Sequence, residues 1–406
     1  MTDTKVLPQR IPQAGHFVTK LNAYQEVALV LQGGGALGSY QAGVYQGLSE
    51  AGVEPHWIAG ISIGALNCAI IAGNPPENRV EALRGFWESI CRPQGVLGDL
   101  ANIGKFPFGV DELIRKSQSA YAACQAIVYG QKGFFTPRLS HPLIGVHKTP
   151  DEISYYHTNL LKKTLLEYTD FDLINKSKMR VSIGAVNVRT GNFIYFDNSK
   201  IKLTAEHFMA SGALPPGFPA IEIDGEYYWD GGLVSNTPLS EVLNQRRNKD
   251  TLVFQVDLWS AHGILPKDMM GVAERMKDIQ YSSRTRAVTN LLSEYQEQAE
   301  LLRELLQLVP KKERQSNPWC KHAEMVASLG RVNVIHLIYA NKTYEGHYKD
   351  YEFSTESLGE HWASGLEDIR QTFKHPAWLS LPTSHRGFST HDIHRTRKTT
   401  EQKPPL

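Results

Sequence analysis

The sequence has few cysteines, almost no net charge and no long apolar run, and each of these shortages argues against a particular class of site, partner or membrane segment. The four cysteines, Cys68, Cys91, Cys124 and Cys320, match neither the spacing of a zinc site nor a disulfide framework. A formal net charge of +1 gives no general attraction to nucleic acid. No stretch approaches the roughly 18 apolar residues of a membrane-spanning helix, and the polar N-terminus lacks the apolar segment of a signal peptide. We therefore expect a cytoplasmic protein with no nucleic-acid partner and, at most, peripheral contact with a membrane.

The sequence does contain an alternation of β-rich and helical segments. A short β-rich run at 27–31 precedes a helical pattern at 39–50, and a second run at 57–61 precedes a small, apolar helix at 65–72. Alternation of this kind favours a parallel sheet with helices on its faces. The predicted fold class is therefore α/β, with three α/β/α layers around a mostly parallel sheet.

Changes in composition divide the chain into four predicted segments. The last 160 residues have a different pattern of predicted secondary structure. A long amphipathic helical pattern at 272–308 and one further strand at 332–339 replace the alternation of short strands and helices. The segments are an irregular leader at 1–24, a main α/β domain at 25–245 with a cap or excursion at 92–150, a helical C-terminal extension at 246–382, and a disordered tail at 383–406.

One candidate nucleophile stands between the second strand and the small-residue helix. Gly60-Ile61-Ser62-Ile63-Gly64 has the G-x-S-x-G pattern of a nucleophile elbow in the strand-to-helix context that such an elbow needs. The flanking glycines relieve the crowding of a tight turn, and the N-terminus of the following helix favours developing negative charge. The alternative interpretation is a strand-to-helix turn in which the serine only caps the helix.

The glycine run at 33–38 has three interpretations. Backbone N–H groups of Gly33, Gly34 and Gly35 would form an oxyanion hole, in which each donor lowers the barrier to acyl transfer by about 3–4 kcal/mol. Gly33, Gly35 and Gly38 also fit the G-x-G-x-x-G pattern of a dinucleotide site, which additionally needs an acid after the next strand. Glu50 and Glu54 lie near that distance but precede the second strand. The third interpretation is a plain tight turn.

A candidate base lies far downstream. Asp230-Gly231-Gly232 follows the aromatic run Tyr227-Tyr228-Trp229 at the end of a predicted hairpin that turns at 224–225. An aspartate with its reference pKa of about 3.9 is a poor base at neutral pH. Desolvation beside bulky aromatic residues would raise that pKa and make the carboxylate a better base.

The order of these three motifs resembles that of the patatin-like phospholipase family. A glycine-rich loop, then G-x-S-x-G, then a distant Asp-Gly-Gly span roughly residues 27–242, and 209–219 adds support. The resemblance implies a patatin-like fold, a Ser–Asp dyad and hydrolysis of acyl esters in lipids, without a metal or a cofactor. Ser62 would be the nucleophile and Asp230 its base, with Gly33, Gly34 and Gly35 around the oxyanion. Gly38, Gly60, Gly64, Gly231 and Gly232 would support the three motifs.

The chain departs from the family pattern at one point and leaves several alternatives open. Many relatives have Arg or Lys in the glycine loop where this sequence has Leu37. A Ser–His–Asp triad would need a late histidine such as His336 or His361 near Ser62. Other functions to weigh are a nicotinamide-dependent oxidoreductase using the glycine loop, and a non-catalytic lipid- or protein-binding module. The long helix at 272–308 suggests packing on the catalytic domain or self-association into a homo-oligomer.

Overall fold

The computed structural model describes residues 20–91, 110–138, 149–245, 248–283, 285–383 and 387–394. Within these ranges the largest sheet has nine strands. Its strands are β1 (Glu26–Leu31), β2 (Trp57–Gly60), β5 (Arg180–Asn187), β6 (Phe193–Asp197), β7 (Ile221–Ile223), β8 (Glu226–Asp230), β9 (Thr251–Asp257), β10 (Val332–Ile338) and β11 (Phe388–Asp392).

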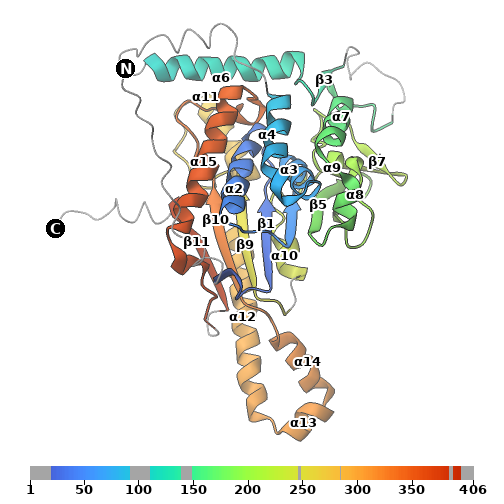
Figure 1. Ribbon diagram of the computed structural model, residues 1–406, viewed down its shortest axis with the longest axis vertical. Helices are drawn as coiled ribbons and strands as arrows, with labels where there is room; N and C mark the ends of the chain where they lie inside the picture. The colour runs from blue at the N-terminus through green and yellow to red at the C-terminus, as the bar shows by residue number, and fades with distance from the viewer. Residues whose placement is uncertain are drawn as a thin grey trace, which may run out of the picture.

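The sheet has the order β11-β10-β9-β1-β2-β5-β8-β7, and β6 pairs with β5. All neighbours from β11 to β5 are parallel, whereas β6, β7 and β8 pair antiparallel. The α/β fold with a mostly parallel sheet between helices is thus confirmed (Figure 1).

The helices are α2 (Ser39–Glu50), α3 (Ile63–Ala72), α4 (Arg79–Ile90), α6 (Val110–Tyr129), α7 (Asn159–Tyr168), α8 (Phe171–Lys176), α9 (Ala205–Ser211), α10 (Leu239–Gln245), α11 (Met269–Tyr281), α12 (Thr285–Leu308), α13 (Lys311–Ser316), α14 (Pro318–Ala327) and α15 (Thr355–Phe373).

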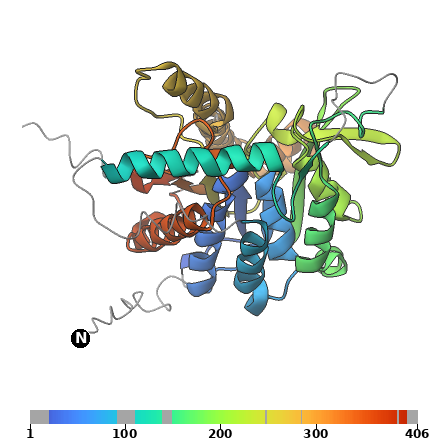
Figure 2. The ribbon, with the colours of Figure 1, turned by 90° about the horizontal axis from the view of Figure 1, so that it is seen from above.

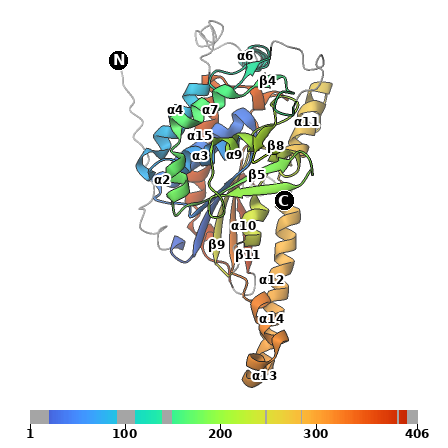
Figure 3. The same ribbon diagram turned by 90° about the vertical axis from the view of Figure 1, so that its right-hand side faces the viewer.

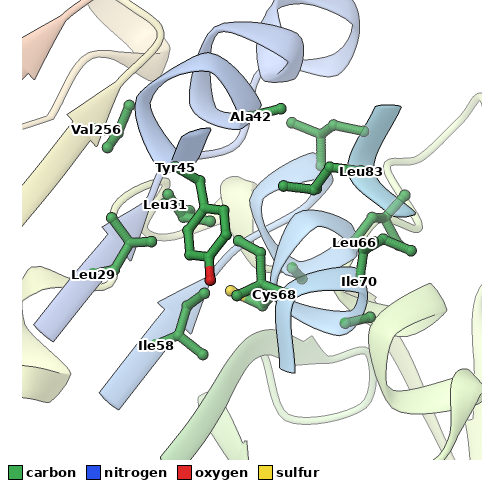
Figure 4. Packing of buried hydrophobic residues seen from close by; sticks show 14 of the residues in the cluster. Leu29, Leu31, Ala42, Tyr45, Ile58, Leu66, Cys68, Ile70, Leu83 and Val256 are labelled. Carbon is green, nitrogen blue, oxygen red and sulfur yellow. The ribbon is translucent and has the colours of Figure 1, made fainter. Parts of the chain in front are cut away.

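The central strands are buried on both faces, which explains why β1 is a continuous apolar run. Leu29 and Leu31 point into the larger core with residues of α2, α3 and α4 (Figure 4). Ala28 and Val30 belong to a smaller core on the other face, where α10 packs. Alternate side chains of a strand point to opposite faces, so a strand between two helical layers must be apolar throughout.

The C-terminal segment is continuous with the same sheet. β9, β10 and β11 extend it beyond β1, and α15 packs closely against α2. A Cβ atom added at Gly43 would lie 2.0 Å from the Trp362 carbonyl oxygen, and one at Gly365 would lie 2.0 Å from that of Tyr40. Glycine on both helices is what allows their backbones to approach this closely. The predicted extension at 246–382 therefore shares a sheet and a core with the predicted catalytic domain.

Two predicted segments differ in detail from the structure. The helical pattern at 272–308 forms two helices, α11 and α12, because the backbone of Ser282 is extended and the Ser283 hydroxyl donates to the Asp257 carboxylate at 2.8 Å. The predicted disordered tail contains β11, whose residues pair in parallel with β10 and whose Phe388 packs on the smaller core. Backbone pairing at a sheet edge is not visible in a short polar sequence.

Parts of the predicted leader and cap lie outside the described residues. These parts are 1–19, 92–109 and 139–148. Within the predicted cap, α6 crosses above the carboxyl ends of the parallel strands (Figure 2). None of the helices in the described ranges is at once long enough and apolar enough to span a bilayer.

Candidate active site

Ser62 lies in the sharp turn between β2 and α3. Its backbone has φ 56° and ψ −126°, a conformation that costs a non-glycine residue about 1–3 kcal/mol unless its surroundings hold it. The Ser62 amide donates to both the carbonyl oxygen and the hydroxyl of Ser211, at 3.1 and 3.0 Å. The Ser211 hydroxyl in turn donates to the Gly184 carbonyl at 2.6 Å. Residues of α9 and β5 thus hold the turn in its strained shape.

The two glycines of the elbow are required by close backbone contacts. A Cβ atom at Gly60 would lie 2.5 Å from the Gly64 carbonyl oxygen, and one at Gly64 would lie 2.4 Å from that of Leu31. The Ser62 side chain makes no capping hydrogen bond to α3. This observation argues against the interpretation of Ser62 as a helix-capping serine and leaves its hydroxyl available for chemistry.

Asp230 stands at the end of β8 and is only 2% exposed. The predicted hairpin delivers it there, since Asp224 and Gly225 both adopt positive φ between β7 and β8. Burial raises the pKa of the Asp230 carboxyl to about 7, although hydrogen bonds from the Ser62 side chain and the Gly232 amide act in the opposite direction. The Gly232 amide donates to Asp230 Oδ1 at 2.7 Å. The structure therefore places the two side chains predicted to react, Ser62 and Asp230, beside each other at one cavity.

The Asp-Gly-Gly glycines fit closely around this carboxylate. A Cβ atom at Gly231 would lie 2.7 Å from the Gly184 carbonyl oxygen, and one at Gly232 would lie 3.1 Å from Asp230 Oδ1. A side chain at Gly231 would displace the backbone around the strand end that carries Asp230, and one at Gly232 would press on the Asp230 carboxylate. The close packing around the end of β8 thus accounts for both glycines that were predicted as motif support.

The glycine loop lies beside Ser62 and is held in place from the C-terminal half of the chain. Three hydrogen bonds hold the Gly33 backbone in place. Its amide donates to the Asn236 carbonyl at 3.2 Å. Its carbonyl accepts from Asn236 Nδ2 at 3.0 Å and from Trp259 Nε1 at 2.9 Å. A Cβ atom at Gly33 would lie 3.0 Å from Ser62 Cβ. The Gly34 and Gly35 amides have no acceptor within the described protein. Of the three predicted oxyanion glycines, Gly34 and Gly35 therefore have amides available to a ligand.

Positive φ and close packing explain two other positions of the loop. Gly35 has φ 57°, and a Cβ atom there would lie 2.2 Å from the Asp350 carbonyl oxygen. Gly38 packs against Ile63, the residue after the candidate nucleophile. Leu37, which stands where many relatives have a basic residue, is fully buried in the larger core.

An apolar cavity of about 80 Å³ opens beside these groups. Ser62, Asp230 and the three loop glycines line one side of it. The lining comes from both halves of the chain, so the sequence boundary at 245 does not enclose the site. The other lining residues are Ile63, Leu66, Phe134, Phe135, Gly212, Leu214, Phe218, Gly232, Asn236, Trp259, Tyr281, Asp350, Tyr351 and Phe353.

No histidine is among these described lining residues. His361 is buried elsewhere, 2.7 Å from Glu345, and His336 lies on β10 with its pKa lowered to about 4 by burial. Glu50, one of the acids considered for a dinucleotide site, pairs with Arg370 on α15 instead. Among the described residues, no three His, Cys, Asp or Glu side chains are grouped as metal ligands would be.

Sequence reasoning missed Gln32, Asn236 and Trp259, which position the glycine loop. The Gln32 side chain accepts from the amides of Leu258 and Trp259 at 2.6 and 3.0 Å, and donates to Thr237 at 2.8 Å. These contacts join segments more than 200 residues apart. The signal available in the sequence was a glutamine at the end of an otherwise apolar strand, where a buried amide must find hydrogen-bond partners.

Ser211→Ala is expected to lower turnover by loosening the elbow. The change removes a hydroxyl that bridges the Ser62 amide and the Gly184 carbonyl, and a lost buried partner costs about 1–3 kcal/mol. We expect kcat for a soluble ester to fall about 10-fold or more while KM changes little, since the cavity lining is intact. Ser235→Ala, a serine outside the cavity, is the matched control; an equal loss in both variants would refute the positioning role.

Comparisons with known proteins come from sequence and from structure. The sequence model of a family described as patatin-like phospholipase matches residues 29–243, more than half of the chain, and one described as patatin phospholipase matches residues 279–385. Triacylglycerol lipase SDP1L from Arabidopsis thaliana is 33% identical over 69 residues, which are 17% of this chain and 9% of the lipase. The match thus spans less than a tenth of the lipase. VipD from Legionella pneumophila aligns with a TM-score of 0.38 and 15% identity, over 86% of this chain and 67% of VipD.

Proposed function

Because the chain belongs to the patatin-like phospholipase family, we propose that it hydrolyses carboxylic esters of lipids through a dyad of Ser62 and Asp230. The observation that carries this proposal is the position of the Ser62 side chain beside a buried carboxylate whose pKa burial raises to about 7. A base with a pKa near the working pH accepts a proton most effectively while remaining largely ionised. The apolar cavity beside the pair suits an acyl chain.

The proposed reaction has two steps that use the same two side chains. Ser62 Oγ attacks the ester carbonyl carbon while its proton passes to Asp230, and the tetrahedral oxyanion accepts hydrogen bonds from the Gly34 and Gly35 amides. The bond to the leaving alcohol then breaks as Asp230 returns the proton to the alkoxide. Water attacks the acyl-Ser62 ester, again giving its proton to Asp230, and collapse releases the carboxylic acid and regenerates the Ser62 hydroxyl.

Hydrolysis of a short-chain p-nitrophenyl ester by the purified protein tests this function. Turnover with release of one carboxylic acid per nitrophenolate, in the presence of a metal chelator, supports the proposal. Absence of turnover with p-nitrophenyl esters, phospholipid and triacylglycerol would favour the non-catalytic binding module. Triacylglycerol is included because the Arabidopsis relative is named as a triacylglycerol lipase.

We also propose that α11 and the loop before it contact the lipid surface from which the substrate comes. Ile264 and Leu265 are 90% and 87% exposed, and Met269 and Met276, seven residues apart on one face of α11, are 78% and 60% exposed. The helix ends at Tyr281, which lines the cavity, and α11 lies near α6 (Figure 3). Burial of this apolar helix face in the interface of a bilayer would remove apolar surface from water, and this would favour binding of the protein to the membrane.

Leu265→Asp/Met269→Asp is expected to separate surface binding from chemistry. Two carboxylates would oppose insertion into an interface, so hydrolysis of an ester presented in phosphatidylcholine vesicles should fall about 10-fold or more. Turnover of a soluble short-chain ester should stay within about two-fold of wild type, because neither residue lines the cavity. Leu166→Asp, at a 57% exposed apolar position on α7, is the control. Equal rates on vesicles for wild type and the double variant would exclude this contact surface.

A further inference from the structure

One buried lysine near the glycine loop has no part in the reaction described above. Lys349 begins the short 3₁₀ helix η4 (Lys349–Tyr351). It is 1% exposed, which makes it the most deeply buried lysine or arginine in the described ranges. A charged side chain is rarely buried to this extent unless partners compensate for the loss of water. The contacts of Lys349 therefore indicate why its charge lies inside the protein.

The Lys349 ammonium contacts a carboxylate and an aromatic ring. Nζ donates to Asp278 Oδ1 at 2.6 Å, and Asp278 is the one residue that α11, which is described throughout, buries. Nζ also lies 4.9 Å from the centre of the Trp259 ring, within the range of a cation–π interaction. The ammonium thus joins α11 to the indole that supports the glycine loop.

The Trp259 indole holds one peptide group of that loop. Its Nε1 donates to the Gly33 carbonyl at 2.9 Å. This carbonyl and the Gly34 N–H belong to the same planar trans peptide and point in opposite directions, so a hydrogen bond that fixes the carbonyl also aims the N–H. The Gly34 amide is one of the two proposed oxyanion donors. The position of the indole therefore sets the direction in which this donor faces.

A second ion pair between α11 and η4 holds Lys349 in place. Lys277 donates to the two carboxylate oxygens of Asp350 at 2.7 and 2.9 Å. Lys277 precedes Asp278 and Asp350 follows Lys349, so the two elements exchange their lysine–aspartate pairs crosswise. The Asp350 backbone also packs against Gly35, where a Cβ atom would lie 2.2 Å from the Asp350 carbonyl oxygen. The crossed pairs therefore anchor η4 directly beside the proposed oxyanion donors.

We propose that Lys349 is a positioning residue, which holds the Trp259 indole so that the Gly34 amide faces the oxyanion. The inference rests on the function proposed above, since an oxyanion forms only where an ester is attacked. Without the ammonium, the indole loses a contact that fixes its place, and the peptide bonded to it is less well aimed. A donor that must reorient stabilises the transition state less than a preorganised one, so kcat falls. The cavity that binds the ester is unchanged, so KM is kept.

The kcat and KM of folded variants with a soluble short-chain ester test this role. Lys349→Met is expected to lower kcat about 10-fold and to keep KM within about two-fold of wild type. Arg180→Met is the matched control. Arg180 lies 3.8 Å from the centre of the buried Trp57 ring and pairs with the buried Asp197, but none of the three lines the cavity. Arg180→Met should be less stable than wild type and keep its kcat. Wild-type kcat in folded Lys349→Met would overturn the proposal.

A second variant removes the ammonium without leaving a buried charge unpaired. Lys349→Met deprives the Asp278 carboxylate of its partner, which is a strongly destabilising change. Lys349→Met/Asp278→Leu removes both charges, and apolar residues in place of a buried ion pair generally leave a protein stable. Thermal unfolding reports whether each variant is folded. This variant should show the same loss of kcat as Lys349→Met, and wild-type kcat in it would also overturn the proposal.

A double-mutant cycle with Trp259→Phe tests the route through the indole. Trp259→Phe keeps an aromatic ring near the ammonium but removes the donor to the Gly33 carbonyl, so kcat should fall about 10-fold. Lys349→Met/Trp259→Phe should be no slower than Trp259→Phe, because the ammonium has no donor left to position. A loss in the double variant of about 100-fold, the product of two independent effects, would overturn the route through Trp259. Inactive wild-type protein would refute the proposed hydrolysis itself, whereas active wild type with unaffected variants refutes the positioning role alone.

Discussion

Ser62→Ala is expected to reduce ester turnover by on the order of 10⁶-fold, which is the loss seen when a serine hydrolase loses its nucleophile and keeps only the catalysis that binding and its oxyanion donors supply. The Ser62 hydroxyl is the group that would form the acyl-enzyme bond, and its removal leaves Asp230 with no proton to accept from the nucleophile. The cavity and the glycine loop should remain, because the Ser62 contacts that hold the turn are made by its backbone amide. Initial rates of hydrolysis of a soluble ester, measured on folded wild-type protein and folded Ser62→Ala, give the ratio of their turnover.

Stability measurements distinguish loss of the nucleophile from loss of the fold. Ser62 has a positive φ, which glycine adopts without strain, so Ser62→Gly should be as inactive as Ser62→Ala and should unfold at a higher temperature than the alanine variant. Ser235→Ala should keep wild-type turnover. Turnover by folded Ser62→Ala within 10-fold of wild type would show that another group attacks the ester.

Asp230→Asn is expected to lower turnover by on the order of 10⁴-fold while making the protein more stable at neutral and higher pH. An amide cannot accept the Ser62 proton, so the first step loses its base. Burial raises the pKa of Asp230 from 3.8 to about 7, so the folded state binds this proton more tightly than the unfolded state. The contribution of the protonated Asp230 carboxyl to the stability of the folded state is fully present below about pH 4, and it is lost as the pH rises through about 7. The Asp230→Asn variant has no charge to bury at this position, so its thermal midpoint should exceed that of wild type at pH 8, with a smaller difference at pH 5.

The same raised pKa predicts the pH dependence of the reaction. Wild-type kcat/KM should rise with pH and level off above about 7, because only the ionised carboxylate accepts the proton. Asp257 provides a matched control: its pKa is also raised to about 7 by burial, yet it does not line the cavity. Asp257→Asn should retain the wild-type profile. Loss of the rise in Asp257→Asn, or its persistence in the residual activity of Asp230→Asn, would assign the titration to a group other than Asp230.

The sequence was sufficient for the parts of the site that depend on short-range patterns. The elbow around Ser62 needs glycines at fixed spacing between a strand and a helix, and the hairpin before Asp230 needs an Asp-Gly turn. Both are properties of a few consecutive residues. The proximity of Ser62 and Asp230 is not local, and it was inferred from the order of motifs in a family rather than from the residues themselves.

The remaining parts depend on contacts between distant segments, which no local pattern encodes. Trp259 and Asn236 fix the glycine loop from positions beyond 230, and Asp350 packs against Gly35 from still further along the chain. The close crossing of α2 and α15 rests on single glycines that look ordinary in sequence. The separation of α11 from α12 follows from a hydrogen bond between Ser283 and Asp257 rather than from a proline or glycine. Each of these contacts joins residues that are distant in the sequence and become neighbours only in the folded sheet and its helices.

Covalent labelling by a fluorophosphonate tests the central claim most directly, because this reagent forms a stable bond only with a serine that is activated as a nucleophile. Peptide mass spectrometry of the labelled wild-type protein is expected to find one modified residue, Ser62, and labelling should be lost in Ser62→Ala and strongly slowed in Asp230→Asn. A modified serine elsewhere, or unlabelled wild-type protein under conditions where it is folded, would contradict the account.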